Sequence, residues 1–240
     1  MLDLFHTFIY EPLYNTLIFL YNVIPGHDFG VAIILTTLAL KTLLVPLSHQ
    51  QIASQKKLQE LQPKMKALQE KHKDDKERQT KALMEFYKEE KVNPLSGCLP
   101  LIVQIIFLIA IYHVIINISK AGFIVNTADL YLFVQNPGPI NHFFLRFIDL
   151  TKPNYVLAFL SAIGQYYQTK MILGRQVTPP LSTNSDQPDF TAIMNKQMLY
   201  LAPGLTFFIG ATFPAALSLY WLFSTLFMIV QQKYIFRVKK

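Results

Sequence analysis

The sequence predicts an all-α membrane protein with five transmembrane helices, an N-terminal interfacial helix and a cytoplasmic helical hairpin. Hydrophobic residues make up 52% of the 240 residues and charged residues only 15%, whereas soluble domains contain about 25% charged residues. Apolar stretches that approach the length of about 20 helical residues needed to cross a bilayer alternate with polar segments. The cations gather in a few of those polar segments. This combination is typical of a multi-pass membrane protein.

Residues 1–27 predict an amphipathic helix that lies in the membrane interface. A secretory signal peptide begins with positive charge and ends in small residues at a cleavage site. This segment instead carries Asp3 and Glu11 and has no Lys or Arg, so we expect it to stay uncleaved. Pro25-Gly26 ends it. Its apolar residues recur near helical spacing: Phe5, Phe8, Ile9, Leu13, Leu17, Leu20 and Ile24.

Residues 28–47 predict the first transmembrane helix, and Lys41 lies inside it. A cation at the centre of a spanning helix costs about 2.5–3.5 kcal/mol. Such a residue usually faces a partner or a water-filled cavity. The alternative is that the Lys41 stem carries the ammonium toward the headgroups, with no further role.

Residues 48–92 predict a cytoplasmic hairpin of two amphipathic helices. Eleven Lys or Arg residues lie in this segment. An apolar stripe recurs at helical spacing in its first half, and Lys73-Asp74-Asp75 is the expected break. The alternative is a solvated linker. The stripe consists of Leu58, Leu61, Met65 and Leu68.

Residues 93–236 predict four further spans, and residues 237–240 form a short basic tail. The spans are expected at about 95–118, 154–174, 197–212 and 215–234, with a loop over 175–195. The chain is almost continuously apolar from Gln197 to Val230, which is too long for one untilted span. Phe213-Pro214 predicts a break in this stretch because proline lacks a backbone donor.

The distribution of cations predicts the orientation of these spans. The hairpin segment carries eleven cations, and four lie near the C-terminus, namely Lys233 and the three of the tail. Three more, Lys170, Arg175 and Lys196, flank the later spans on the same side. The opposite side has three, namely Lys120, Arg146 and Lys152. Because cytoplasmic loops are enriched in Lys and Arg, the N-terminus is expected outside and the C-terminus in the cytoplasm.

Polar residues recur at a similar depth in the cytoplasmic half of the predicted spans. At a helical rise of about 1.5 Å per residue, Lys41 lies about 9 Å from the end of its span. Such a shared layer predicts a hydrophilic cavity that opens toward the cytoplasm. For each residue alone, bonding between helices or within its own helix is the alternative. The other members of the layer are Gln104, Gln165, Gln168, Thr206, Ser224 and Thr225, and Tyr220-Trp221 lies too deep for an interfacial belt.

The sequence carries no pattern that predicts catalysis or a cofactor. We find no HExxH, GxSxG or P-loop motif. The six histidines have no ligand spacing, and one cysteine, Cys98, offers neither a disulfide nor a zinc site. The excess of positive charge reflects membrane topology, so no nucleic-acid binding is expected. Because the motifs and ligand spacings are absent from the sequence, no metal and no catalytic residue is expected.

Two stretches resemble the signature motifs of the YidC/Oxa/Alb family of membrane protein insertases, namely NPLSGCLPLIVQ at 93–104 and FPAALSLYW at 213–221. The order of segments over about 9–236 is also similar. The resemblance implies a cytoplasm-open groove with Lys41 as its cation and Gln104 as its second-span glutamine. Gln168 is the best match in the third span, with Gln165 as a rival. Tyr220 and Trp221 match the aromatic pair of the motif, and most bacterial members have arginine in place of Lys41.

The resemblance further implies a protein of the plasma or inner membrane that inserts and helps to fold other membrane proteins. Its expected partners are nascent membrane proteins and the lipid bilayer. The Sec translocon, the ribosome or a signal-recognition receptor would bind through residues 48–92. Two other classes remain open, namely a small-solute transporter, which would show inverted repeats, and a structural membrane scaffold.

Overall fold

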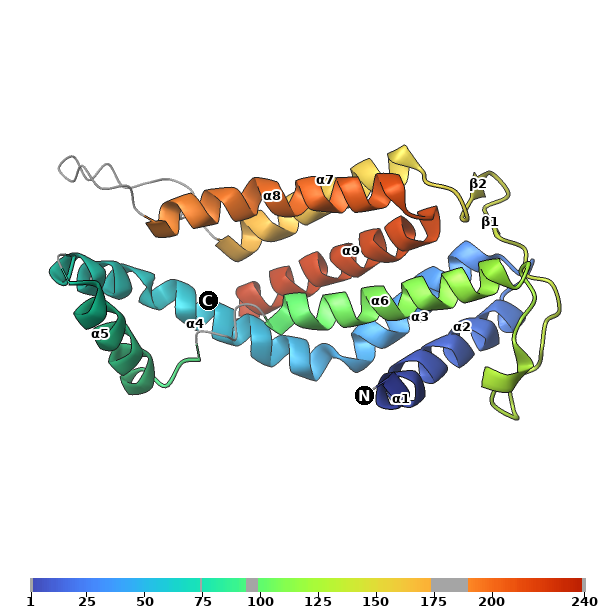
Figure 1. The fold of residues 1–240 in the computed structure, drawn as a ribbon, viewed down its shortest axis with the longest axis horizontal. Helices are drawn as coiled ribbons and strands as arrows, with labels where there is room; N and C mark the ends of the chain where they lie inside the picture. The colour runs from blue at the N-terminus through green and yellow to red at the C-terminus, as the bar shows by residue number, and fades with distance from the viewer. Residues whose placement is uncertain (1, 74, 94–98, 174–189, 239–240) are drawn as a thin grey trace. The chain divides into compact units, whose positions relative to one another are not determined.

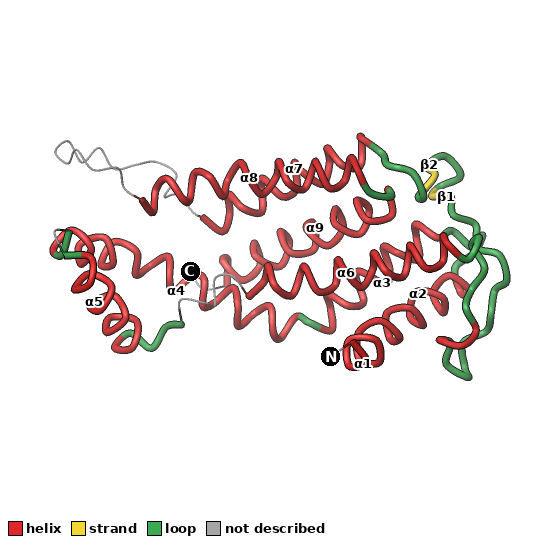
Figure 2. The backbone as a smooth tube through the Cα atoms, viewed as in Figure 1, coloured by secondary structure: helices red, strands yellow, loops and turns green. Residues whose placement is uncertain are grey.

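The computed structural model describes residues 2–73, 75–93, 99–173 and 190–238, and nearly all of its regular structure is helical (Figures 1 and 2). The only strands in these ranges are the two-residue β1 (Phe143–Phe144) and β2 (Ile148–Asp149), which pair antiparallel. Cys98, most of the loop expected over 175–195 and the last two residues lie outside the described residues.

The chain divides into two compact units. The first, which we call the bundle unit, comprises Met1–Leu43 and Ile105–Gln231. The second, the hairpin unit, comprises Leu44–Gln104 and Gln232–Lys240. Each unit is described by itself.

The N-terminal segment of the bundle unit is helical almost throughout. Helix α1 (Leu2–Phe5) leads into a π-helical turn, η1 (His6–Tyr10), and then into α2 (Glu11–Val23). The apolar face of α2 packs on α3 (Phe29–Leu43), and Leu17 and Ile18 are fully buried. The expected amphipathic helix is therefore present, and its place in the membrane interface stays a prediction.

Pro46 starts a new helix and does not close the first span. Helix α3 ends at Leu43, four residues before the expected end at 47, and α4 (Val45–Lys71) begins directly after Leu44. Proline is favoured in the first turn of a helix because the backbone donor it lacks would be unsatisfied there. The expected end of this helix is therefore wrong.

The remaining helices are α6 (Leu99–Lys120), α7 (Tyr155–Leu173), α8 (Phe190–Thr212) and α9 (Ala215–Val238). Helices α7 and α8 lie side by side (Figure 1). Helix α8 ends and α9 begins on either side of Phe213-Pro214, where the sequence predicts a break. Helix α8 starts at Phe190, so its first turns fall within the segment that was expected to be a loop.

Two described helices are long and apolar enough to cross a membrane, Ile102–Lys120 and Ala215–Ile235. A third is obtained when Phe29–Leu43 and Val45–Leu58 are counted together as one span. The helices α7 and α8 fall where spans were expected, but they do not meet the same length and hydropathy criteria. The count of five spans stays a prediction.

The connection between α6 and α7, residues 121–154, is fixed to the N-terminal helix by buried polar side chains. The amide of Asn15 donates to the Asp129 carbonyl (2.8 Å), and its oxygen accepts from the Tyr131 N–H (2.7 Å). The Tyr21 hydroxyl accepts from the Asn141 N–H at 2.8 Å. The same connection also holds the start of α9, because Ala215 and Ala216 donate to the carbonyls of Lys152 and Leu150.

The hairpin unit contains α4 and α5 (Lys76–Glu89), which pack against each other. The side chain of Asp75 caps α5 by accepting from the N–H groups of Glu77 and Arg78. Lys64 pairs with Glu90 at 3.0 Å, and Lys57 donates to the Glu90 carbonyl at 2.6 Å. The turn between the helices falls at the expected break.

Candidate functional site

Lys41 is buried in the bundle unit near the end of α3. Its side chain is 8% exposed, although a lysine is seldom buried to this degree. Its ammonium lies 3.7 Å from the Met228 Sδ of α9. The cation is therefore directed into the bundle and does not extend along the protein surface.

Gln168 of α7 reaches the same sulfur from another helix. Its side-chain amide donates to Met228 Sδ at 3.3 Å, and the residue is 5% exposed. Three helices that are far apart in the sequence thus converge at Met228. A thioether is a weak acceptor on a flexible side chain, so this junction can repack at little cost.

A second polar contact joins α7 and α9 close to this junction. The indole N–H of Trp221 donates to Gln165 Oε1 at 3.1 Å. The amide nitrogen of Gln165 in turn donates to the Thr169 hydroxyl at 3.3 Å. Both glutamines that were candidates for the third span therefore contact α9, and the structure does not choose between them.

The residues of α9 that make these contacts share one face of the helix. Trp221, Ser224, Thr225 and Met228 follow the spacing of three, four and seven residues that places side chains on one side. Ser224 and Thr225 are buried. A Cβ atom on Gly164 of α7 would lie 3.4 Å from the Thr225 methyl group, an ordinary van der Waals contact, so α7 and α9 lie close together here. We call Lys41, Gln165, Gln168, Trp221 and Met228 the lysine end of the bundle unit.

Three further predicted residues are buried or half-buried. Tyr220 is 1% exposed and belongs to the apolar core. Thr206 donates to the Ala202 carbonyl of its own helix at 3.0 Å, which is the packing alternative. Gln104 is half-buried and belongs to the hairpin unit. The structure therefore brings together part of the predicted layer, and a groove role for Tyr220 and Gln104 stays a prediction.

Closer to the start of α9, the polar residues of α7, α8 and α9 form a closed interface. The Ser161 hydroxyl lies 2.8 Å from the Leu157 carbonyl oxygen and 2.9 Å from that of Ser218. The Ser218 hydroxyl lies 3.3 Å from the Gly210 carbonyl oxygen. These hydroxyls bond to backbone within the protein, so they stabilise the bundle and leave the lysine end as the candidate site.

Sequence reasoning missed Met228, which contacts both Lys41 and Gln168. The available signal was its position seven residues after Trp221, on the same helix face. Among the described residues, no group of three or more His, Cys, Asp or Glu side chains could hold a metal ion. The chemistry of the site is therefore that of one cation beside amide, indole and thioether groups.

A comparison with known proteins shows the family. A sequence profile described as 60Kd inner membrane protein matches residues 19–240. The chain belongs to this family. The result confirms the resemblance to YidC-type proteins and the expectation of a protein of the inner membrane.

Individual relatives agree with the family profile. The chain is 36% identical over 228 residues to the membrane protein insertase YidC of Geotalea daltonii. It is 32% identical over 225 residues to the protein of the same name from Geobacter metallireducens, and 34% identical over 225 residues to that of Shewanella amazonensis. Each alignment covers 94% of this chain, and the chain spans only 36% of the length of each relative.

Proposed function

We propose that this chain inserts membrane proteins into the lipid bilayer and helps them to fold, with Lys41 as the residue that attracts their polar flanks. The single observation that carries the proposal is the burial of Lys41 at a junction of α3, α7 and α9. The family supports it, since relatives over 94% of the chain are named membrane protein insertases.

The cation would act on the acidic residues in the short tail of a substrate. An ammonium forms stronger hydrogen bonds with a carboxylate than with a neutral sulfur, because both groups are then charged. A tail carboxylate would therefore displace the Met228 thioether from Lys41. Lysine lacks the planar fork of arginine, so it would attract a carboxylate as a point charge.

The polar face of α7 and α9 would lower the barrier for the rest of the tail. Burying the apolar helix of a substrate in lipid is favourable and needs no fuel. The costly step is moving polar backbone and side chains through hydrocarbon. In the proposed arrangement, five spans enclose a groove that opens to the cytoplasm. The polar side chains of Gln165, Gln168 and Trp221 shorten the thickness of hydrocarbon that the substrate tail must cross.

The hairpin unit would recruit substrates on the cytoplasmic side. The unit carries most of the cations of the chain, and several of these are exposed. A basic surface of this kind suits anionic partners. A ribosome, a signal-recognition receptor or the Sec translocon would bind through residues 48–92 in this proposal.

The test is an insertion assay in cells depleted of their own insertase, with a single-span substrate that has an acidic translocated tail. Lys41→Arg is expected to insert this substrate as well as the wild type. Lys41→Leu and Lys41→Glu are expected to lower insertion by at least about tenfold, the loss corresponding to one charge-assisted hydrogen bond. Protease protection of the translocated tail provides the measurement.

The matched control is Lys170→Glu, because Lys170 is an exposed cation on α7 whose ammonium lies over the Tyr166 ring. This variant changes net charge by the same amount as Lys41→Glu and should leave insertion unchanged. Full insertion by Lys41→Leu would contradict the attraction mechanism and would favour a scaffold without an intramembrane cation.

A further inference from the structure

A cavity of about 530 Å³ lies in the bundle unit at the C-terminal end of α6. Its size falls within the range of about 300–1,000 Å³ that is typical of small-ligand sites. It is independent of the proposed insertion site, and none of its residues belongs to the lysine end. The lining residues are Tyr10, Tyr14, Asn117, Ile118, Lys120, Ala121, Ile124, Val125, Asn126 and Asp129.

One cation and one carboxylate line this cavity without forming an ion pair with each other. Lys120 is exposed at the end of α6 and makes no ion pair with any described residue. Asp129 Oδ2 accepts from the side-chain amide of Asn126 at 3.0 Å. Its Oδ1 has a long contact, 3.8 Å, with the His6 Nε2. Lys120 is therefore available to an anionic group, and the Asp129 oxygens keep lone pairs beside their contacts with Asn126 and His6.

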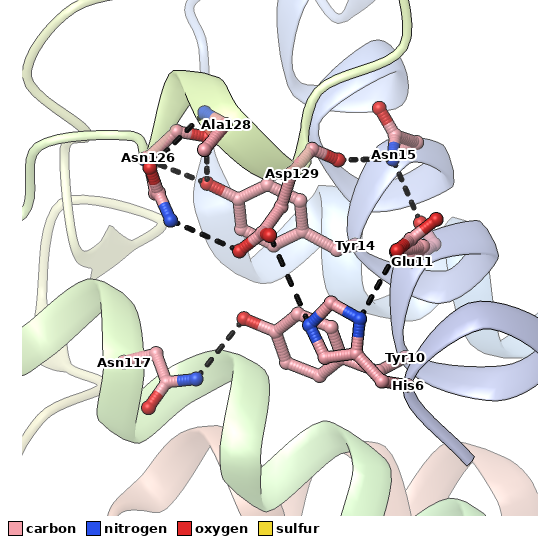
Figure 3. A network of polar contacts seen from close by, with 9 residues as sticks. All are labelled: His6, Tyr10, Glu11, Tyr14, Asn15, Asn117, Asn126, Ala128 and Asp129. Carbon is pink, nitrogen blue, oxygen red and sulfur yellow. Dashed lines mark hydrogen bonds and ion pairs between the residues drawn. The ribbon is translucent and has the colours of Figure 1, made fainter. Parts of the chain in front are cut away.

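The two hydroxyl groups in the cavity come from the N-terminal segment and are held by Asn117 of α6 and Asn126 of the connection that follows it (Figure 3). The Tyr14 hydroxyl accepts from the Asn126 N–H at 2.9 Å, and the Tyr10 hydroxyl accepts from the Asn117 amide at 3.1 Å. Burial raises the pKa of Tyr14 to about 12 and also raises the pKa of Tyr10. Both phenols are therefore neutral. The Tyr14 hydroxyl donates to the Asn126 carbonyl at 3.3 Å, and the Tyr10 hydroxyl can serve as a hydrogen-bond donor to an anionic group.

The π-helical turn η1 shapes one side of the site. Such turns occur often at functional sites, and they bring residues five apart together. The His6 ring nitrogen accordingly lies 3.0 Å from the Glu11 carboxylate. The His6, Tyr10 and Tyr14 rings form a continuous stack, with centroids 4.9 Å and 5.8 Å apart. Tyr10 thus stacks with two neighbouring rings.

The position of the cavity restricts its ligand further. Lys120 is the last residue of the apolar stretch Ile102–Lys120, which is long enough to cross the membrane. In the predicted membrane orientation, the cavity lies at the depth of the lipid headgroups. Its apolar side chains, Ile118, Ile124 and Val125, provide a surface for the glycerol and the first carbons of an acyl chain.

We propose that this cavity binds the headgroup of a zwitterionic phospholipid with a primary amine, such as phosphatidylethanolamine. The phosphate would lie near Lys120 and the amide of Asn117, and the ammonium near Asp129. A primary ammonium has three N–H donors for such acceptors, whereas a choline group has none. Choline sites rely on open aromatic faces, whereas Tyr10 stacks with the rings of His6 and Tyr14.

The test uses the full chain, purified in detergent and incubated with dioctanoyl lipids that differ only in headgroup. Native mass spectrometry counts the bound lipid. The wild type is expected to bind phosphatidylethanolamine about tenfold more tightly than phosphatidylglycerol or phosphatidylcholine, the ratio for one charge-assisted hydrogen bond. Equal binding of the three lipids would overturn the proposal without any variant.

Two variants test whether Asp129 binds the lipid ammonium and whether Lys120 binds the lipid phosphate. Asp129→Asn keeps the backbone carbonyl that bonds to Asn15 and should remove the preference for phosphatidylethanolamine over phosphatidylcholine. Lys120→Gln should weaken the binding of phosphatidylethanolamine and phosphatidylglycerol alike. The matched controls are Asp149→Asn and Lys152→Gln, which change an ion pair of 3.1 Å outside the cavity and should leave the preference intact. An unchanged preference in Asp129→Asn would contradict the assignment.

Discussion

The two ends of the bundle unit hold their polar side chains in different ways. At the end formed by residues 121–154 and the start of α9, which we call the loop end, the buried polar groups bond to backbone. Asn15 bonds to three backbone groups, and Ser161 and Ser218 lie close to carbonyl oxygens. At the lysine end, Lys41 and Gln168 instead contact one thioether.

This difference separates structural from adaptable polar residues. A buried backbone group that loses its partner costs about 1–3 kcal/mol, so the loop end tolerates few rearrangements. A methionine side chain can change its rotamer at little cost, and its sulfur is a weak partner. A site that must receive different substrates needs the second kind of surface.

The largest effect on stability is expected from Asn15→Ala. This change removes hydrogen bonds to the Glu11 and Asp129 carbonyls and from the Tyr131 N–H. We expect it to lower the free energy of unfolding by about 2–4 kcal/mol, since buried backbone groups lose their partner. Thermal unfolding of the full chain in detergent, followed by circular dichroism, measures the loss.

The control is Asn22→Ala, on the same helix. Asn22 makes a single exposed hydrogen bond to the Gln135 carbonyl, at 2.7 Å. Its replacement should cost under about 1 kcal/mol because water can replace the side chain. Equal losses of unfolding free energy in Asn15→Ala and Asn22→Ala would contradict this view of the loop end. The α6–α7 connection would then not depend on buried hydrogen bonds.

A second test at the loop end is Gly210→Ala. A Cβ atom at this position would lie 2.7 Å from the Ser218 hydroxyl and 2.9 Å from the Ala158 methyl group. Overpacking of this kind costs about 1–3 kcal/mol. At Gly204, on the same helix, an added Cβ would meet no atom within 4 Å. Gly204→Ala should therefore be neutral or stabilising, because alanine favours helix.

At the lysine end, Met228→Leu is expected to change stability by less than about 1.5 kcal/mol, because the volume is nearly conserved. Met228→Glu should instead place a carboxylate beside Lys41 and occupy it. Insertion of substrates with acidic tails would then fall, whereas Met228→Leu would retain most of it. Equal activity of the two variants in the protease-protection assay would show that the cation need not be accessible.

The smallest effect concerns Asp149 in the α6–α7 connection. Burial raises the pKa of this carboxyl, but hydrogen bonds from Thr151 and Lys152 outweigh burial and hold the pKa below its usual value. Its contribution to stability is therefore complete above about pH 4 and is lost as the pH falls through the lowered pKa. Asp149→Asn should reduce the acid sensitivity of the unfolding temperature below about pH 4, compared with the wild type.

The sequence predicted those features that depend on local chemistry. Phe213-Pro214 separates α8 from α9 because proline cannot continue the helix. Lys41 was singled out because a cation in an apolar helix is costly. Gln165 and Gln168 were expected to share a layer with Lys41, and Gln168 contacts the same sulfur as Lys41. Trp221 was singled out by its depth and by the motif, and it donates to Gln165.

The features that depend on distant contacts were not predictable. Asn15 bonds to residues 114 and 116 positions further along the chain, and no local pattern encodes such a pairing. His6 was dismissed as one of several scattered histidines, because the π-helical turn that brings it to Glu11 has no clear sequence signal. Thr206 matched the layer by depth alone, and depth does not determine which helix face a residue occupies.

The most direct test of the central claim is a charge swap between Lys41 and the substrate. The wild type and Lys41→Glu are reconstituted into liposomes, and insertion is measured for two substrates that differ only in an acidic or a basic tail. We predict that the wild type favours the acidic tail and that Lys41→Glu favours the basic one. The same preference for the acidic tail in both proteins would contradict the role of Lys41.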